Sequence, residues 1–159
     1  MQQSETRSAE VTWRNTRATG YAVVFNSWST IAGLFEERVM PGAFKRTLRE
    51  SPDVLALWHH RYGDVFGRTS SGSLALREDS KGLYFELDID PRSPVGAHAL
   101  TAIDRGDVRG CSYGFRVTSE SWDDDGIGLP RRTITDVDLF EVTLTPTPAF
   151  TATTVSLRA

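Results

Sequence analysis

Residues 110–122 and 132–144 have the sequences GCSYGFRVTSESW and RTITDVDLFEVTL, and both runs are rich in β-branched and aromatic residues. Residues of these types favour strands. The segment between the runs, DDDGIGLP at 123–130, contains an Asp-Gly pair that is typical of a hairpin turn. The sequence therefore predicts one long antiparallel hairpin.

Shorter strands are predicted on both sides of this hairpin. The run TGYAVVF at 19–25 has the composition of a buried strand, and the stretch TATTVSL at 151–157 is β-branched. Four more runs between positions 53 and 89 are separated by the turn signals RYG, SSG and DSKG; they are DVLALWHH, DVFGRT, SLALRED and GLYFELDI. This density of short strands predicts a meander or a barrel.

Two helices should flank the strands. Apolar residues recur at helical spacing between Pro41 and Ser51. A second helix is expected from Ser93, a typical N-cap, to Gly106, a typical stop. No repeat or linker divides the chain, so we expect a flexible arm at residues 1–10 and a single α+β domain at 11–159, with mainly antiparallel strands.

Composition excludes several classes of protein. The 159 residues include 39% hydrophobic and 25% charged residues, as in an ordinary globular domain. A net charge of −3 argues against nucleic acid or an anionic membrane surface as the main partner. Cys111 is the only cysteine, so no internal disulfide can form and a reducing compartment is expected. Residues 1–10 are polar and no apolar run approaches the length of a membrane span, so we expect neither a signal peptide nor a membrane-spanning segment.

Alternation within the first strand of the hairpin presents a candidate nucleophile. Cys111 and Tyr113 should face the core, whereas Ser112 and Gly114 should face the other way. Glycine beside the serine would let a substrate approach closely. A serine hydroxyl needs a base within hydrogen-bond reach before it can attack a carbonyl. Cys111 is the alternative nucleophile, but its predicted face makes it a buried structural thiol.

The base must come from three histidines. His98 lies in the second predicted helix, whereas His59 and His60 follow a strand. Neighbours on a strand point in opposite directions, so only one of this pair can face the site, and periodicity does not choose between them. An equally simple interpretation is that both histidines merely solvate the end of the strand.

Several blocks, in this order along the chain, resemble the prohead serine proteases of tailed phages: GYAVVFNS, VMPGAF, DVLALWHH with GRTSSGSL, EDSKGLYFELD, IDRGDVRGCSYGF and LFEVTLTPTPAF. The resemblance extends from about residue 19 to 157. It implies that His60 is the general base, because the family has an Asn-His-Asp segment before Gly-Arg-Thr, and that Ser112 is the nucleophile, because it begins the Ser-x-Gly-Phe block. His59 and Arg61 depart from this pattern.

The third member of the triad is left open between two glutamates. Glu86 and Glu141 each lie opposite the apolar face of a predicted strand, so either side chain could orient the imidazole. Each has an equally simple interpretation as a solvent-facing residue. Oxyanion donors could be backbone N–H groups near Gly110 or Gly114, or the arginines at 131–132, for which a solvated hairpin stem is the simpler interpretation.

The resemblance also implies a fold and a biological role. The fold would be a herpesvirus-protease-like β-barrel with helices around it. The enzyme would be a serine endopeptidase without a cofactor that cleaves the scaffolding segment of the phage major capsid protein, and itself, inside the immature prohead in the host bacterial cytoplasm. The portal protein and further copies of the chain are additional expected partners. We hypothesise that the end at Ala159 arises from self-processing or from the design of the expressed gene.

Two rival interpretations remain. The first is a catalytically inactive capsid-interior module of the same fold, which the departures at His59 and Arg61 keep open. The second is a metal-dependent hydrolase, built on Asp88, Asp90 and the histidines. The run at 123–126 faintly resembles a calcium loop, but the remaining ligands are missing, so we expect a charged hairpin tip and no metal site.

Overall fold

The computed structural model describes residues 15–148 and 152–158. The predicted arm at residues 1–10 lies outside this part. The strands are β1 (Arg17–Val24), β2 (Ser29–Ile31), β3 (Phe35–Val39), β4 (Leu55–Trp58), β5 (Arg61–Arg68), β6 (Leu74–Glu78), β7 (Gly82–Asp88), β8 (Gly110–Asp123), β9 (Arg131–Thr145) and β10 (Thr154–Arg158). The helices are α1 (Lys45–Arg49) and α2 (Pro94–Arg105), with a 3-10 turn at Thr69–Ser71.

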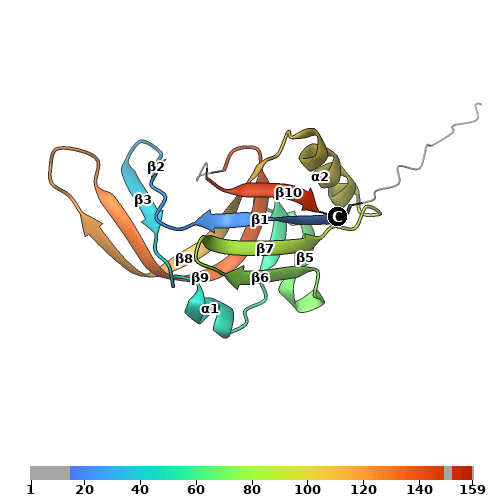
Figure 1. Cartoon of the computed structure of the whole chain (residues 1–159), viewed down its shortest axis with the longest axis horizontal. Helices are drawn as coiled ribbons and strands as arrows, with labels where there is room; N and C mark the ends of the chain where they lie inside the picture. Colours follow the sequence, from blue (N-terminus) through green and yellow to red (C-terminus); the bar gives the residue numbers. More distant parts are fainter. Residues whose placement is uncertain (1–14, 149–151, 159) are drawn as a thin grey trace, which may run out of the picture.

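The strands form two sheets. One has four strands in the order β10-β1-β7-β6, and the other has the order β2-β3-β9-β4-β5, with β8 paired to β9 as a sixth strand. Pairing among the described residues gives two open sheets and no closed ring of strands, so the predicted barrel is not confirmed. The prediction of a mainly β domain with two helices is correct (Figure 1).

The strand β9 organises the larger sheet. It pairs with β8 in antiparallel fashion along almost its whole length and with β3 and β4 in parallel. The two parallel pairings depart from the antiparallel arrangement that the sequence predicts. Because β8 occupies one edge of β9 along its length, β3 and β4 pair with the two ends of the other edge, and α1 lies between them in the chain. In Figure 1 the distal parts of β8 and β9, together with β2 and β3, project from the rest of the domain.

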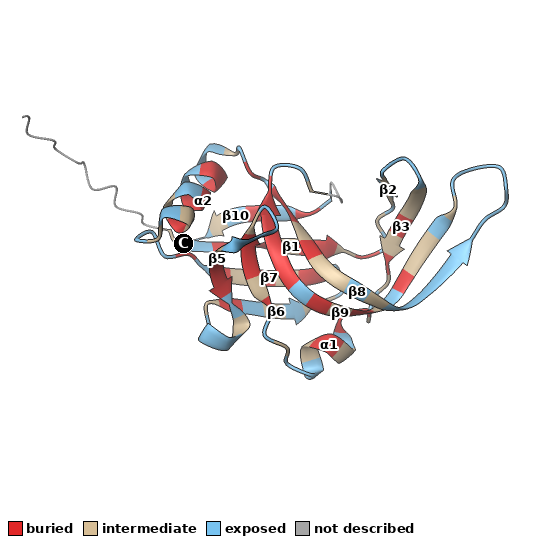
Figure 2. Ribbon diagram, turned by 180° about the vertical axis from the view of Figure 1, so that it is seen from behind, coloured by how far each residue is buried: buried red, intermediate tan, exposed pale blue. Residues whose placement is uncertain are grey.

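A single apolar core lies between the sheets. Phe85 and Leu87 from β7 belong to the same buried cluster as Val142 and Leu144 from β9. The helix α2 adds Leu100 and other buried residues to this cluster. Figure 2 shows buried positions along the central strands and exposed positions on the distal hairpin. This core fixes β8, β9 and β4 side by side, with their other faces available for a site.

Candidate active site

The two histidines form a turn and not the end of a strand. Trp58 pairs with Arg61, so His59 and His60 are the central residues of a two-residue hairpin turn between β4 and β5. Their φ angles are +51° and +58°, as a primed hairpin turn requires. The prediction that RYG makes this turn is therefore wrong, because those residues begin β5. Histidine is one of the few residue types that is enriched in the left-handed region.

Contacts with β9 hold this turn in place. The His59 N–H donates to the Leu144 carbonyl at 3.0 Å, and the His60 N–H donates to Thr143 Oγ1 at 2.9 Å. His59 Nδ1 lies 2.8 Å from Thr145 Oγ1. Alternate residues of one strand therefore anchor both histidines, which offsets the cost of two non-glycine residues at positive φ.

Substitution at His59 should test this left-handed turn. We expect the free energy of unfolding of His59→Val to be about 1–2 kcal/mol lower than that of His59→Asn. A β-branched residue is disfavoured at positive φ, whereas asparagine is tolerated there. Both variants lose the imidazole contact with Thr145, so their difference reports the backbone preference. Urea denaturation followed by tryptophan fluorescence measures it, and equal stabilities would contradict the described turn.

The imidazole of His60 meets a buried carboxylate. His60 Nδ1 is hydrogen-bonded to Glu141 Oε1, and the Glu141 side chain is only 4% exposed, whereas that of His60 is 47% exposed. The second carboxylate oxygen, Oε2, is buried without a hydrogen-bond partner among the described residues. Because Nδ1 is engaged by Glu141, Nε2 is the ring nitrogen that remains free to exchange a proton with another group.

A bulge and a glycine make room for this carboxylate. Glu141 pairs with Gly114, and the register shifts between this pair and Phe115–Leu139, which leaves Phe140 as an extra residue of β9. A Cβ at Gly114 would lie 2.6 Å from Glu141 Oε1 and 2.7 Å from its Cγ. Glycine is therefore required at 114, because any side chain there would displace Glu141.

Ser112 lies on the same face of the sheet, and β9 separates its strand, β8, from the β4–β5 turn. It pairs directly with Thr143, and cross-strand partners project to the same side of a sheet. Thr143 in turn accepts the N–H of His60. The predicted alternation is confirmed, since Cys111 is fully buried and Tyr113 is 5% exposed, while Ser112 is partly exposed. The residues Ser112, Glu141 and His60 thus come from β8, β9 and the β4–β5 turn, on one face of the larger sheet.

The other predicted groups lie elsewhere. Glu86 is in the four-stranded sheet, where it accepts a hydrogen bond from Tyr84 and lies 3.9 Å from Arg17, so the structure does not bring it to His60. His98 is on α2, with its ring against Trp58. Both arginines of the hairpin stem are paired: Arg131, which is exposed, with Glu36, and the less exposed Arg132 with Glu37 and Glu120.

Cys111 has the properties of a structural thiol. Its Sγ donates to the carbonyl oxygens of Tyr21 and Thr154 at 3.3 and 3.1 Å. Burial raises the pKa of this thiol well above its ordinary value. The prediction that it is a core residue and not a nucleophile agrees with this environment. No group of three or more His, Cys, Asp or Glu that could hold a metal ion occurs among residues 15–148 and 152–158.

An ion-pair cluster attaches α1 to β9 near the bulge. Arg46 donates to Asp136 Oδ2 at 2.9 Å and to Asp138 Oδ1 at 2.7 Å. These bonds to Arg46 hold the pKa of both carboxyls below the usual range. The cluster lies immediately before the bulge that presents Glu141, so it fixes the path of β9 at that point.

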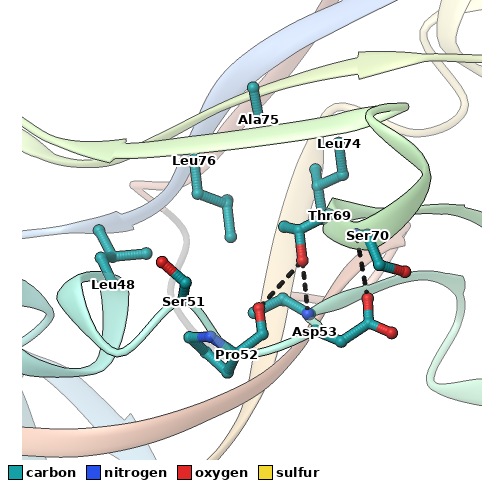
Figure 3. Close-up of a pocket in the computed structure, with 10 residues that line it drawn as sticks. Leu48, Ser51, Pro52, Asp53, Thr69, Ser70, Leu74, Ala75 and Leu76 are labelled. Atoms are coloured by element: carbon teal, nitrogen blue, oxygen red, sulfur yellow. Dashed lines mark hydrogen bonds between the residues drawn. The ribbon is translucent and has the colours of Figure 1, made fainter.

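A cavity of about 500 Å³ lies between α1, the 3-10 turn and β6 (Figure 3). The Thr69 hydroxyl in its lining is engaged within the fold, since Oγ1 donates to the Pro52 carbonyl and accepts from the Val54 N–H. Leu48 and Leu76 line another part of it. None of His60, Ser112 and Glu141 lines this cavity, so we place no site there.

Comparisons with known proteins give one consistent result. A family model described as caudovirus prohead serine protease matches residues 2–159. The prohead protease of Enterobacteria phage HK97 is 31% identical over 105 residues, which are 65% of this chain and 43% of that protein, so the chain spans less than half of this relative. The solved varicella-zoster virus protease is similar with a TM-score of 0.52 at 15% identity, over 90% of this chain and 64% of the other; this likeness concerns the fold alone.

Within the described residues, no helix has both the length and the apolar character needed to span a membrane.

Proposed function

This chain belongs to the caudovirus prohead serine protease family, and on that premise we propose that it is a capsid-maturation endopeptidase with Ser112 as nucleophile, His60 as general base and Glu141 as the third member of the triad. The observation that carries the proposal is the hydrogen bond from His60 Nδ1 to the buried Glu141 carboxylate, on the face of the sheet where Ser112 lies. Glu86 is not part of the proposal.

The chemistry follows the general logic of acyl transfer. Glu141 holds the proton on Nδ1, so Nε2 accepts the proton of Ser112 as Oγ attacks the scissile carbonyl carbon. The resulting imidazolium, stabilised by Glu141, gives its proton to the leaving amine when the peptide bond breaks. His60 then accepts a proton from water, whose oxygen attacks the acyl-enzyme, and returns that proton to Ser112 Oγ. The products are a free amine and a free carboxylic acid.

Threonines of β9 hold the proposed base in a fixed position relative to the proposed nucleophile. Thr143 binds the backbone of His60 and is also the cross-strand partner of Ser112, so one residue fixes the spacing of base and nucleophile. A base held in its productive orientation loses little entropy when the substrate binds. The departures from the family pattern at His59 and Arg61 leave this geometry intact, since His59 contacts Thr145 and Arg61 lies 3.7 Å from Asp64.

Membership of the family and the name of the HK97 relative, a prohead protease, support a proposal about the substrates. We propose that the chain cleaves the scaffolding segment of the phage major capsid protein inside the immature prohead, and that it also cleaves itself. The portal protein and other copies of the chain are further proposed partners. These steps would take place in the cytoplasm of the infected bacterium.

Labelling with a serine-directed fluorophosphonate tests the proposal. The wild type should be labelled at Ser112, which peptide mass spectrometry locates. The signal should disappear in Ser112→Ala and fall at least about 100-fold in rate in His60→Ala, because the hydroxyl is then without its base. Ser121→Ala, an exposed serine of the same strand, is the matched control and should label normally.

Absence of labelling in a folded wild type would refute the triad and favour the catalytically inactive capsid-interior module. Labelling that survives in His60→Ala at the normal rate would refute His60 as the base.

A further inference from the structure

A groove of about 490 Å³ is lined by residues that adjoin His60 and Glu141 in the sequence and in the strand register. Its apolar lining comes from the segment before β4, from β4 and β5, and from the bulge of β9: Pro52, Leu55, Tyr62, Leu139 and Phe140. The groove is separate from the cavity in Figure 3, although Pro52 and Asp53 border both.

Register connects the groove to the proposed active site. Leu55 is the parallel-strand partner of Glu141, so both side chains project to the same side of the sheet. Phe140 directly precedes Glu141, and Tyr62 follows His60 by two positions. A peptide whose scissile bond lies at His60 would therefore have neighbouring residues within reach of this groove.

Two exposed aromatic residues mark the groove. Tyr62 is 68% exposed and Phe140 is 46% exposed. Each lies where a strand ladder is interrupted: Phe140 is the extra residue of the β9 bulge, and Tyr62 lies between the register positions Arg61 and Val65 of β5. Such interruptions re-aim side chains and are common beside active sites. Covering exposed aromatic surface of this kind with an apolar group lowers the free energy of the complex.

The charges around the groove are already paired. Arg68 binds Asp53, and Asp138 binds Arg46 and Arg116. The hydrogen bond to Arg68 lowers the pKa of Asp53 to about 2, which keeps this pair ionised over the physiological range. A charged ligand group would therefore have to displace an existing partner, whereas an apolar group would not.

We propose that this groove is a specificity subsite that binds one large apolar side chain of the peptide, at a fixed position near the scissile bond. The proposal rests on the proposed function, because the occupant is the peptide that Ser112 cleaves. Leu, Ile, Met and Phe side chains have the size and chemistry that fit Leu55, Tyr62 and Phe140.

A peptide-library digest tests the subsite. The purified full chain is incubated with a mixture of proteome-derived peptides, and new termini are identified by mass spectrometry, with Ser112→Ala subtracted as background. The wild type should favour large apolar residues over serine at one fixed position by about tenfold or more, as expected for an apolar pocket. Tyr62→Ser and Phe140→Ser should each reduce this ratio severalfold.

The control is Ile127→Ser. Ile127 is 91% exposed on the tip between β8 and β9, so this variant also removes an exposed apolar side chain. Its preference for large apolar residues over serine should equal that of the wild type. The ratio is measured within each variant, so a general loss of turnover does not alter it.

Four results would overturn the subsite. Cleavage that depends on Ser112 but shows no apolar preference, or a preference unchanged in Tyr62→Ser and Phe140→Ser, overturns the subsite and leaves the proposed function standing. No cleavage that depends on Ser112 overturns the proposed function and the subsite with it. If sedimentation shows a wild-type dimer that these two variants dissociate without any change in preference, the groove is an interface between copies.

Discussion

Replacing Ser112 with alanine is expected to lower proteolytic turnover on the order of 10⁶-fold, because the reaction then has no nucleophile to form the acyl-enzyme. The measurement is co-expression with the phage coat protein, with processing followed by gel electrophoresis and intact mass. Wild-type cells should contain shortened coat protein, and Ser112→Ala cells should contain only the full-length form.

The loss must be separated from a folding defect. Ser112 is only partly buried, and alanine keeps its Cβ and its place opposite Thr143, so the thermal unfolding midpoint should change by no more than a few degrees. Ser121→Ala should process the coat protein as the wild type does. Processing by Ser112→Ala at a comparable rate would end the assignment of a serine protease.

Glu141→Gln is expected to reduce kcat by about 10³–10⁴-fold with little change in KM, the pattern of an interaction that matters mainly in the transition state. The amide carries no charge to stabilise the imidazolium, and its NH₂ group turned toward Nδ1 would select the wrong tautomer of His60. Steady-state kinetics on a peptide derived from the coat protein measures the effect.

Glu86→Gln is the matched control, because the sequence offers both glutamates as candidates for the same role. Glu86 contacts Arg17 and Tyr84 in the other sheet, so its substitution should change kcat less than twofold. Similar losses in the two variants, or a greater loss in Glu86→Gln, would show that the wrong carboxylate has been chosen.

Features set by nearby residues could be predicted from the sequence. The helix at 94–105 begins and ends as expected, with Ser93 accepting from the Gly96 N–H and Gly106 in the left-handed region. The hairpin of β8 and β9 and the alternation around Ser112 are also confirmed. Helix caps and period-two alternation depend on a few consecutive residues, so one sequence is enough to identify them.

Features that depend on distant partners could not be predicted. The strand β3 is not among the predicted strands. The glutamates of its sequence FEERV are typical of exposed residues, yet Glu37 is 4% exposed and pairs with Arg132 from β9. The choice between Glu86 and Glu141 required the register of β9 against β4 and β8. The turn at His59 and His60 was misplaced because neither residue is a usual turn former, although the tolerance of histidine for positive φ was a signal.

The residues of the proposed triad come from β8, β9 and the β4–β5 turn, and this has a consequence for biosynthesis. His60 and Glu141 are 81 positions apart, and β4 reaches β9 only by a parallel pairing that closes this long loop. Long-range pairing of this kind forms late, after local hairpins and helices. A partly synthesised or partly folded chain would therefore lack the proposed triad geometry until the ladder between β4 and β9 had closed.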